Sequence, residues 1–481
     1  MKSLFLFMFA FSLAAYGVEK KTTPMKNEAA QKECITCHTR KSPGIVEQWR
    51  ASTHSKKNVG CLDCHTADES RPDAFMHHGA KITVVVTPKA CAQCHKNEVD
   101  QFQASHHANA GKILGSLDNS LAEYVEGHVR FTDKGEKIGQ SAVATSGCLQ
   151  CHGSEIKVLP NGNLDPTTWP NTGIGRLNPD GTKGSCSACH LRHEFSKTQA
   201  RQPESCGRCH LGPDHPQMEI WKESKHGISF EANRERLVKD MKSKKSWIPG
   251  KDYETGPTCS SCHMGATAKL PVTHDVGARI SWTLRPAISE KIDAGDKKAG
   301  KKDFKTWESR RDDMQQVCTS CHASPWVENF YTQFDSLVGL YNDKFAIPAT
   351  TLFKLVQAKK LIPTDIQFTT KIEFSYYLLW HHEGRRARHG AAMMGPDYTQ
   401  WHGMFEVAER FYTQFIPDLK DLIKESKEKG GDFASGAKEV EAKMNEVLAS
   451  EMHRWSTGNM PPAEKDARKK AQDEFKKRYA Q

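Results

Sequence analysis

Hydrophobic side chains recur at helical spacing in the last third of the chain. Residues 373–389 and 404–426 carry apolar side chains three or four positions apart, as at Val407 and Phe411, which places them on one face of a helix. Pro417 is expected to interrupt the second segment, because proline lacks the amide hydrogen that a helix interior uses. The pattern therefore predicts long amphipathic helices here.

Two further segments continue this character toward the C-terminus. Residues 435–452 are expected to form another helix, and the polar residues 463–481 a helix or a frayed end. The region also contains aromatic residues expected in the core or in subunit contacts, namely Phe374, Tyr376, Tyr377, Trp380, Phe405, Phe411 and Tyr412. The predicted architecture for residues 326–481 is a C-terminal helical bundle.

The preceding part of the chain has a different pattern. Segments such as 160–163 and 178–181 combine Pro, Asn, Asp and Gly, which favour turns, and little alternation of polar and apolar residues indicates strands. With 37% hydrophobic residues and 34 glycines, the sequence is poorly suited to bury an ordinary core over this length. We therefore predict a mainly α protein whose residues 18–325 are poor in strands and need apolar surface from another source.

The first residues have the pattern of a cleaved secretory signal peptide over 1–17. Lys2 precedes an apolar run from Leu4 to Ala15, small residues follow, and charge begins at Glu19. The run is shorter than the ~20 apolar residues that a membrane-spanning helix needs, and no hydrophobic anchor is expected near the C-terminus. We expect an exported protein located in the periplasm or an equivalent compartment.

All 16 cysteines belong to eight copies of the pattern Cys-x-x-Cys-His. Two thiols one helical turn apart reach the two vinyl groups of a haem, and the adjoining histidine ligates its iron. The copies are Cys34/Cys37/His38, Cys61/Cys64/His65, Cys91/Cys94/His95, Cys148/Cys151/His152, Cys186/Cys189/His190, Cys206/Cys209/His210, Cys259/Cys262/His263 and Cys318/Cys321/His322. The motifs predict eight covalently bound c-type haems and leave no cysteine for a disulfide.

Zinc ribbons are the alternative interpretation of repeated Cys-x-x-Cys. Four thiolates share the metal in such a ribbon, and no histidine is needed directly after the second cysteine. In this chain a histidine follows every copy, so the haem interpretation is favoured. The porphyrin faces would supply the apolar surface that the side chains of residues 18–325 lack.

The formal net charge of +10 does not by itself indicate a nucleic-acid or membrane partner. Each haem brings two propionates, so about sixteen carboxylates are missing from the sequence count. The lysine-rich stretches 239–245 and 297–302 are expected to be solvated loops, with docking of a redox partner as the alternative. We expect no nucleic-acid partner.

Fifteen histidines outside the motifs could provide second axial ligands. They are His54, His77, His78, His106, His107, His128, His193, His215, His226, His274, His381, His382, His389, His402 and His453. A haem with two histidine ligands is suited to electron transfer, whereas a haem with one protein ligand keeps a position open for chemistry. The central functional question is whether one haem is left open.

The order of the motifs and several segments between them resemble the hydroxylamine oxidoreductase family of octahaem cytochromes. The resemblance runs from Cys34 to at least Met404. The segments that carry it are Ser52-Thr53-His54, Arg192-His193-Glu194-Phe195-Ser196, Asp214-His215, Ser224-Lys225-His226-Gly227 and Thr273-His274. Membership of this family implies an enzyme that acts on hydroxylamine or nitrite and assembles as a homotrimer.

The resemblance also implies seven distal ligands for seven haems. They are His54, one of His77 or His78, one of His106 or His107, His193, His226, His274, and one of His381, His382 or His389. From the alternatives we select His78, His107 and His389. The family places its open haem at the fourth motif, so the resemblance assigns catalysis to the haem of Cys148, Cys151 and His152.

Asp214 and His215 are expected, by the same resemblance, on the vacant face of that haem. An aspartate beside a histidine gives an oriented imidazole that can exchange protons near neutral pH, as conversion of nitrogen–oxygen compounds requires. Without the family context, an Asp-His pair is more often a loop turn with a surface histidine. Their predicted role is proton transfer at the open haem.

Two departures from the family bear on the direction of the reaction. Residues 153–185 form a long insertion between the fourth and fifth motifs. Oxidising members cross-link a tyrosine of a neighbouring subunit to the catalytic haem, and the positional counterpart here is Tyr398, whose flanking residues differ from theirs. We therefore expect no cross-link, and reduction of nitrite or hydroxylamine to ammonium slightly favoured over hydroxylamine oxidation.

Three functions remain open from the sequence. The first is a periplasmic oxidoreductase for nitrogen compounds, supplied with electrons by a periplasmic or membrane-anchored cytochrome or another quinol-linked partner. The second is an electron-transfer protein in which every haem has two ligands, and the third is a relative that reduces sulfur oxyanions such as tetrathionate. No motif ends in Cys-x-x-Cys-Lys, which argues against the pentahaem nitrite reductases.

Overall fold

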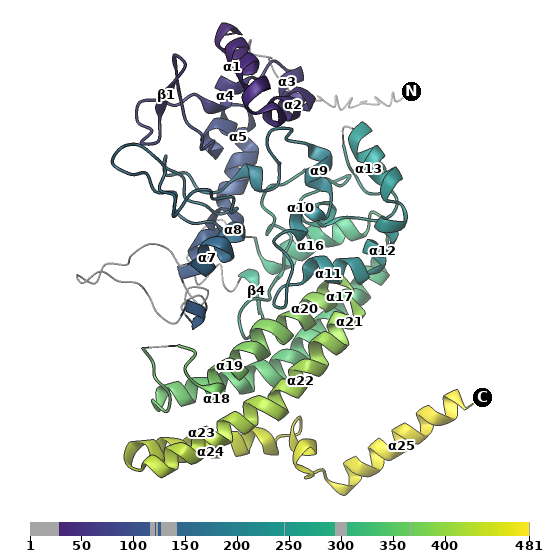
Figure 1. Cartoon of the computed structure of the whole chain (residues 1–481). Coiled ribbons are helices and arrows are strands. Elements are labelled where there is room, and N and C mark those ends of the chain that lie inside the picture. Colours follow the sequence, from purple (N-terminus) through teal and green to yellow (C-terminus); the bar gives the residue numbers. More distant parts are fainter. Residues whose placement is uncertain are drawn as a thin grey trace, which may run out of the picture.

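The computed structural model describes residues 28–115, 121, 124–126, 142–244, 246–293, 305–365 and 367–480. The described chain is mainly helical, with two small two-stranded sheets. Short helices and loops form one end of the molecule and long helices form the other, while the last helix, α25 (Pro462–Tyr479), extends away from both (Figure 1). The mainly α fold predicted from the sequence is confirmed.

The part of the chain that carries the motifs consists of short helices joined by loops. These are α1 (Glu28–Lys41), α2 (Pro43–Ala51), α3 (Thr53–Lys56), α4 (Cys61–His65), α5 (Pro88–Ala104), η1 (His107–Gly115), α7 (Ala142–Ser146), α8 (Cys148–His152), η2 (Cys186–Ala188), α9 (Lys197–Arg201), α10 (Glu204–Gly207), α11 (Gln217–Glu223), α12 (Lys225–Ala232), α13 (Arg234–Ser243) and α14 (Cys259–His263). Helices this short are marginal in isolation, so packing must stabilise them.

Serine caps fix the start of two helices that carry predicted ligands. Ser52 and Ser224 each accept a hydrogen bond from the backbone N–H three residues later, at 3.1 Å and 3.2 Å. A cap of this kind contributes about 1 kcal/mol to helix stability. The second residue of each helix is a histidine, His54 in α3 and His226 in α12. Because the cap fixes where the helix begins, it also fixes the backbone position from which that imidazole extends.

A tight hairpin joins β1 (Phe75–His77) to β2 (Ala80–Ile82), with Phe75 opposite Ile82 and His77 opposite Ala80. The two turn residues, His78 and Gly79, have φ values of 46° and 77°. Positive φ at both positions matches the right-handed twist of the strands. The second hairpin, β3 (Trp282–Thr283) with β4 (Glu290–Lys291), is shorter still.

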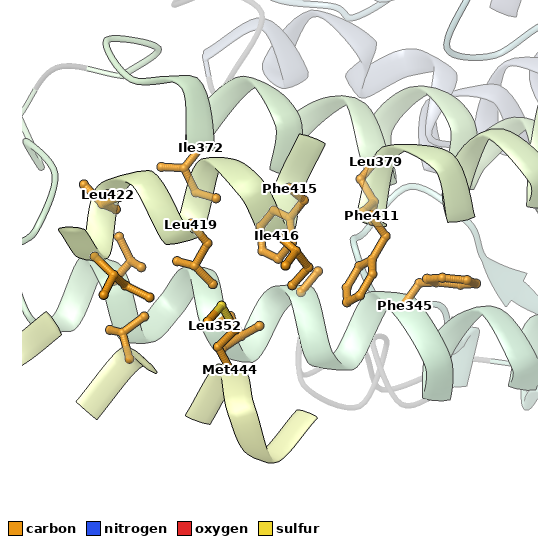
Figure 2. Packing of buried hydrophobic residues seen from close by; sticks show 14 of the residues in the cluster. Phe345, Leu352, Ile372, Leu379, Phe411, Phe415, Ile416, Leu419, Leu422 and Met444 are labelled. Atoms are coloured by element: carbon orange, nitrogen blue, oxygen red, sulfur yellow. The ribbon is translucent and has the colours of Figure 1, made fainter. Parts of the chain in front are cut away.

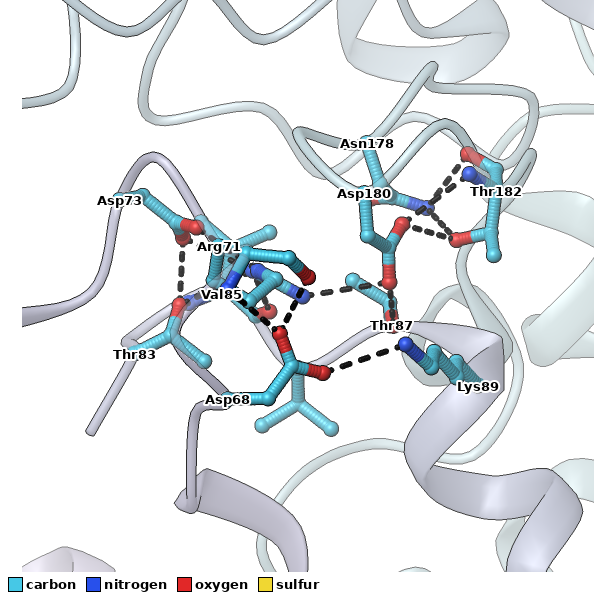
Figure 3. Close-up of polar contacts among 12 residues, drawn as sticks. Asp68, Arg71, Asp73, Thr83, Val85, Thr87, Lys89, Asn178, Asp180 and Thr182 are labelled. Atoms are coloured by element: carbon cyan, nitrogen blue, oxygen red, sulfur yellow. Dashed lines mark hydrogen bonds and ion pairs between the residues drawn. The ribbon is translucent and has the colours of Figure 1, made fainter. Parts of the chain in front are cut away.

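The insertion 153–185 is fastened to the region of the first hairpin by a buried polar network (Figure 3). The Arg71 guanidinium donates to both carboxylate oxygens of Asp73 at 2.8 Å and to Asp180 of the insertion at 3.2 Å. Thr87 donates to the same Asp180 carboxylate at 2.6 Å. Since each buried charge has charged or hydrogen-bonding partners, this network holds the insertion in one position.

A largely helical part of the chain begins with α16 (Trp307–Cys318), which ends at Cys318 of the last motif. The helices that follow are α17 (Ser324–Tyr341), η3 (Asn342–Ala346), α18 (Ile347–Ala358), α19 (Lys371–Leu378), η4 (Leu379–Glu383), α20 (Gly384–Met393), α21 (Pro396–Thr399), η5 (Gln400–Phe405), α22 (Glu406–Arg410), η6 (Phe411–Phe415), α23 (Ile416–Lys429), α24 (Gly431–Ala449) and η7 (Arg454–Thr457). Successive members are continuous, so helical backbone runs through 324–358, 371–393 and 396–429.

The expected interruption at Pro417 is wrong, because a π-helical segment accommodates it. In η6 the Ile416 amide donates to the Phe411 carbonyl five residues back. The wider turn relieves the clash that a proline makes with the carbonyl four residues earlier, and the helix continues. The same π-helical arrangement precedes Pro348. The Ile347 amide, directly after η3, donates to the carbonyl of Asn342, the first residue of η3.

The main hydrophobic core lies among these long helices (Figure 2). Val407, Phe411, Phe415 and Leu419 are fully buried, as the helical spacing predicted. They pack against residues of the other long helices, including Tyr341, Phe345, Leu352, Ile372, Leu379 and Met444. Phe405, in contrast, is 49% exposed, so of the two expected positions the core of this chain is excluded and a subunit contact stays a prediction.

The first lysine-rich stretch is helical and not a loop as predicted. Residues 239–243 form the last part of α13, where Leu237 and Met241 are buried and the lysines point outward. The stretch is amphipathic, and its apolar residues decide the conformation while its lysines stay solvated. The second stretch, 297–302, lies outside the described residues. Within the described ranges, no helix has the length and apolar character needed to cross a membrane.

Candidate functional site

Thiols from different motifs lie against one another in the core of the motif-bearing part. Cys91 of the third motif lies beside Cys186 of the fifth, Cys151 of the fourth beside Cys209 of the sixth, and Cys206 of the sixth beside Cys259 of the seventh. Groups attached at these thiols would therefore lie close together. Such proximity is what electron transfer among several haems requires.

Two predicted attachment residues, Cys37 and Cys94, differ from these paired thiols. Cys94 is exposed on α5 and Cys37 is only partly buried on α1, and no side-chain hydrogen bond joins either of them to another described residue. The structure therefore does not bring these two thiols into a shared buried cluster. Their assignment to haems rests on the spacing within each motif, which needs local helix geometry and no burial.

Six motif histidines face a histidine from elsewhere in the chain at a common separation. The ring centres are 6.2 Å apart for His38–His77, 6.4 Å for His65–His193, 6.3 Å for His54–His95, 6.5 Å for His190–His274, 6.1 Å for His107–His210 and 6.1 Å for His226–His322. Two imidazoles that bind one metal from opposite sides, each at roughly 2 Å, hold their centres about 6 Å apart. The pairs therefore fit an iron between them.

The protonation of these histidines also suits a metal. Burial lowers the pKa of His190 to about 4, and it lowers the pKa of His54, His193 and His226 as well. The imidazoles are held toward the neutral form, in which a ring nitrogen can ligate a metal. In addition, the buried Nδ1 atom of His274 has no hydrogen-bond partner among the described residues. The donor set thus fits haem iron.

The structure distinguishes between the two histidines of the first hairpin. His77 ends β1 and its ring faces His38, whereas His78 occupies the turn, with its ring 4.7 Å from that of His77. The hairpin turn directs consecutive side chains differently. The geometry favours His77 over the selected His78 as the partner of the first motif.

Three predicted histidines gather around the sixth and seventh motifs. The ring of His107 lies 6.1 Å from that of His210, and burial lowers the pKa of His107 to about 4. His389 is partly buried, and desolvation together with neighbouring charges holds its pKa well below the usual value. His106 lies against Gly277. The backbone of the preceding residue, Val276, is hydrogen-bonded to His263 of the seventh motif.

Asp214 and His215 form a hydrogen-bonded pair in the loop between the sixth motif and α11. The Asp214 Oδ1 atom lies 2.5 Å from Nδ1 of His215, and about a third of the His215 side chain is exposed. A carboxylate that accepts from Nδ1 leaves Nε2 as the free nitrogen of the ring. The histidine is thus oriented, with one nitrogen available for exchange of a proton.

The opposite oxygen of Asp214 is held by the C-terminal helices. Oδ2 accepts from Nη1 of Arg385 at 3.0 Å and lies 3.9 Å from Nδ1 of His381. Burial opposes ionisation of Asp214, but the hydrogen bond from His215 and the charges of His215, His381 and Arg385 hold its pKa well below its usual value. Asp214 is therefore a carboxylate throughout the neutral range.

The Asp214–His215 pair lies beside the sixth motif, where the ring of His215 is 6.2 Å from that of His210. Cys209 of this motif lies beside Cys151 of the fourth, so the sixth motif connects the pair to the fourth. The insertion 153–185 wraps the fourth motif from the other side, where Gly175 donates to the His152 carbonyl at 3.0 Å. The backbone approaches so closely here that a side chain at Gly173 would collide with Gly153.

Tyr398 lies apart from this pair within the chain. It is in α21, where its amide contacts Glu223 at 3.3 Å and its ring lies 5.6 Å from that of His402. Burial and the charges of Glu219 and Glu223 raise its pKa.

Sequence reasoning missed two residues that contact Asp214 or its neighbours. Arg385 was not considered, and Tyr377 was expected only in the core or in a subunit contact, yet its hydroxyl lies 3.2 Å from Nε2 of His381. The available signal was the run 381–388, which places two histidines and three arginines within an otherwise amphipathic helix.

Comparisons with known proteins agree with the motif analysis. Residues 179–348 match the family model "Seven times multi-haem cytochrome CxxCH", and residues 12–66 and 90–190 match "Cytochrome c554 and c-prime". The chain is 26% identical over 351 residues to a probable nitrite reductase-hydroxylamine oxidoreductase fusion protein of Kuenenia stuttgartiensis. That alignment covers 63% of this chain and only 35% of the relative's length.

Two solved structures share the fold. A "hypothetical multiheme protein" superposes with a TM-score of 0.70 at 26% identity, covering 84% of this chain and 97% of its own. A "reducing HAO-like protein complex" of Kuenenia stuttgartiensis superposes with a TM-score of 0.54 at 20% identity, covering 85% and 89%. Together with the motifs and the facing histidines, these matches identify the chain as a relative of the multihaem c-type cytochromes, a redox protein that carries covalent haems.

Proposed function

We propose that this protein is a periplasmic octahaem enzyme that reduces nitrite or hydroxylamine to ammonium at one open haem. The observation that carries the proposal is the contrast between two kinds of site. Six motif histidines face a second histidine at the spacing of a doubly ligated iron, whereas an oriented Asp214–His215 pair lies beside the sixth motif, which adjoins the fourth. The first arrangement suits electron transfer, and the second suits proton-coupled chemistry.

In this proposal the motif histidines and their partners hold seven haems. His77, His193, His54, His274 and His226 would serve the first, second, third, fifth and eighth motifs, and His107 and His389 would share the two that remain, the sixth and the seventh. His152 would hold the haem of the fourth motif, which would supply the redox-active iron at which substrate binds. The thiol contacts between the fourth and sixth motifs support passage of electrons to this haem.

The chain's own residues supply protons and orientation. His215 donates from Nε2 to a bound nitrogen–oxygen species, while Asp214 holds the ring through Nδ1 and stabilises its charged form. Arg385 holds Asp214 in place from the opposite side. Because reduction to ammonium consumes several protons, a donor that is partly exposed and can be reloaded from solvent suits the reaction.

The name of the curated relative includes both nitrite reductase and hydroxylamine oxidoreductase, so the direction of reaction rests on Tyr398. A tyrosine bonded to the porphyrin would favour oxidation of hydroxylamine. The different residues around Tyr398 favour an unmodified haem and hence reduction. We further propose a homotrimer that receives electrons from a periplasmic or membrane-anchored cytochrome.

Steady-state assays of the purified holoprotein test the proposal. Turnover is measured with nitrite, hydroxylamine and tetrathionate, each with a reduced dye, and with hydroxylamine and an oxidised dye. We expect fastest turnover in nitrite or hydroxylamine reduction, eight haem additions in the intact mass, and one high-spin haem in resonance spectra. Eight low-spin haems that do not respond to nitrite or hydroxylamine would establish an electron carrier instead.

A further inference from the structure

Arg385 is a buried arginine with an unused hydrogen-bond donor. It is 6% exposed, and its Nη1 atom donates to Asp214, but its Nε atom has no hydrogen-bond partner among the described residues. Buried arginines usually pair their N–H groups, because an unpaired buried donor is costly. The free N–H therefore indicates that a further acceptor can bind beside Asp214.

A second unused donor lies next to the same carboxylate. His381 is 7% exposed, its Nδ1 is 3.9 Å from Oδ2 of Asp214, and this nitrogen has no hydrogen-bond partner in the described part of the chain. Its other nitrogen, Nε2, lies 3.2 Å from the Tyr377 hydroxyl. If Tyr377 donates to Nε2, the proton of the neutral imidazole resides on Nδ1, on the side of Asp214.

Among the described side chains near Arg385, positive charges outnumber negative ones. The charged groups that face Arg385 are Arg285 and Arg388, which are positive, and Asp214, which is negative. Arg285 is exposed at the surface, and its charge also acts on His381. Arg385, which pairs with Asp214, thus lies near two further guanidinium groups, of which one is at the solvent boundary. Such an arrangement attracts an anion from solvent toward Asp214.

We propose that Arg385 and His381 form an anion-binding subsite beside Asp214–His215, which accepts a small oxyanion of the size and charge of nitrite. The inference rests on the proposed function and narrows its two candidate substrates to nitrite. Hydroxylamine is uncharged near neutral pH, so a guanidinium group adds little to its binding. Arg385 positions Asp214 through Nη1 and binds the anion through Nε. The subsite selects nitrite over hydroxylamine.

Binding measurements on the oxidised holoprotein test this inference independently of turnover. Nitrite and hydroxylamine are titrated calorimetrically into the wild type and into Arg385→Gln, Arg385→Lys and Arg386→Gln. Arg386 is the matched control, since it is the next residue of α20 and pairs with Glu406 and Glu383. We expect Arg385→Gln to weaken nitrite binding by about 10- to 100-fold, the loss of a charge-assisted hydrogen bond, and to change hydroxylamine binding by less than about threefold.

The conservative variant and the surface arginine provide further readouts. Arg385→Lys should restore part of the nitrite affinity, and Arg386→Gln should leave it unchanged. If Arg385→Gln fails to fold, Arg285→Gln remains usable, because Arg285 is exposed, and it should weaken nitrite binding more at low salt than at high salt.

The outcomes separate this inference from the proposed function. Equal weakening of nitrite and hydroxylamine, unchanged nitrite affinity in Arg385→Gln, or no nitrite binding by the wild type would each overturn the subsite. Nitrite binding that depends on Arg385 in a protein that reduces neither substrate would support the subsite and overturn the proposed function.

Discussion

Replacing each member of the Asp214–His215 pair should separate proton transfer from structural support. In His215→Ala the proton donor is lost, while the bond of 3.0 Å between Asp214 and Arg385 stays in place. We expect nitrite turnover to fall by about 10²- to 10⁴-fold, the usual contribution of a positioned acid, with little change in the melting temperature.

Asp214→Asn should cost both activity and stability. The amide cannot neutralise Arg385, and removing one partner of a buried ion pair destabilises a protein by about 3 kcal/mol or more. The amide NH₂ can also face Nδ1 of His215 and invert the tautomer, so turnover should fall as far as in His215→Ala. The matched control is Asp165→Asn, which removes another aspartate that hydrogen-bonds to nearby residues.

Turnover with a reduced dye, haem content and thermal unfolding are measured on each variant. Full turnover in His215→Ala at normal haem content would refute the proton-transfer role. A loss of activity in Asp214→Asn that is fully proportional to its loss of haem would show that the pair is structural alone.

Three further predictions concern the core, the insertion and Tyr398. Phe411→Ala should lower the free energy of unfolding by about 3–5 kcal/mol, whereas the same change at the half-exposed Phe405 should cost much less, as measured by chemical denaturation. Burial by itself raises the pKa of Asp180. The hydrogen bonds from Thr182 and Thr87 and the charge of Arg71 lower this pKa by more than burial raises it, so the net shift is downward from 3.8. The stabilisation from Asp180 is therefore present above about pH 4 and is lost as the pH falls below it, and Asp180→Asn should flatten this part of the acid-unfolding curve. Peptide mapping should recover Tyr398 without a bond to the haem peptide of Cys148 and Cys151; recovery of the bonded form would favour hydroxylamine oxidation.

The sequence by itself determined the features that depend on neighbouring residues. The haem motifs are local, because the porphyrin fixes the distance between the two thiols and the position of the histidine. The buried face of 407–419 is local too, because the helical repeat alone decides which side chains share a face. The Asp214–His215 contact joins adjacent residues, so it also could be anticipated.

Tertiary structure decided the features that join distant parts of the chain. His193 faces His65 across more than a hundred residues, and the choice of His77 over His78 follows from a hairpin turn with two positive φ values. Arginine on an amphipathic helix is read from sequence as a solvated charge, but packing against the loop of Asp214 buried Arg385. Burial is a property of the whole assembly of helices and not of any segment, which is why the anion-binding subsite became visible only in the folded chain.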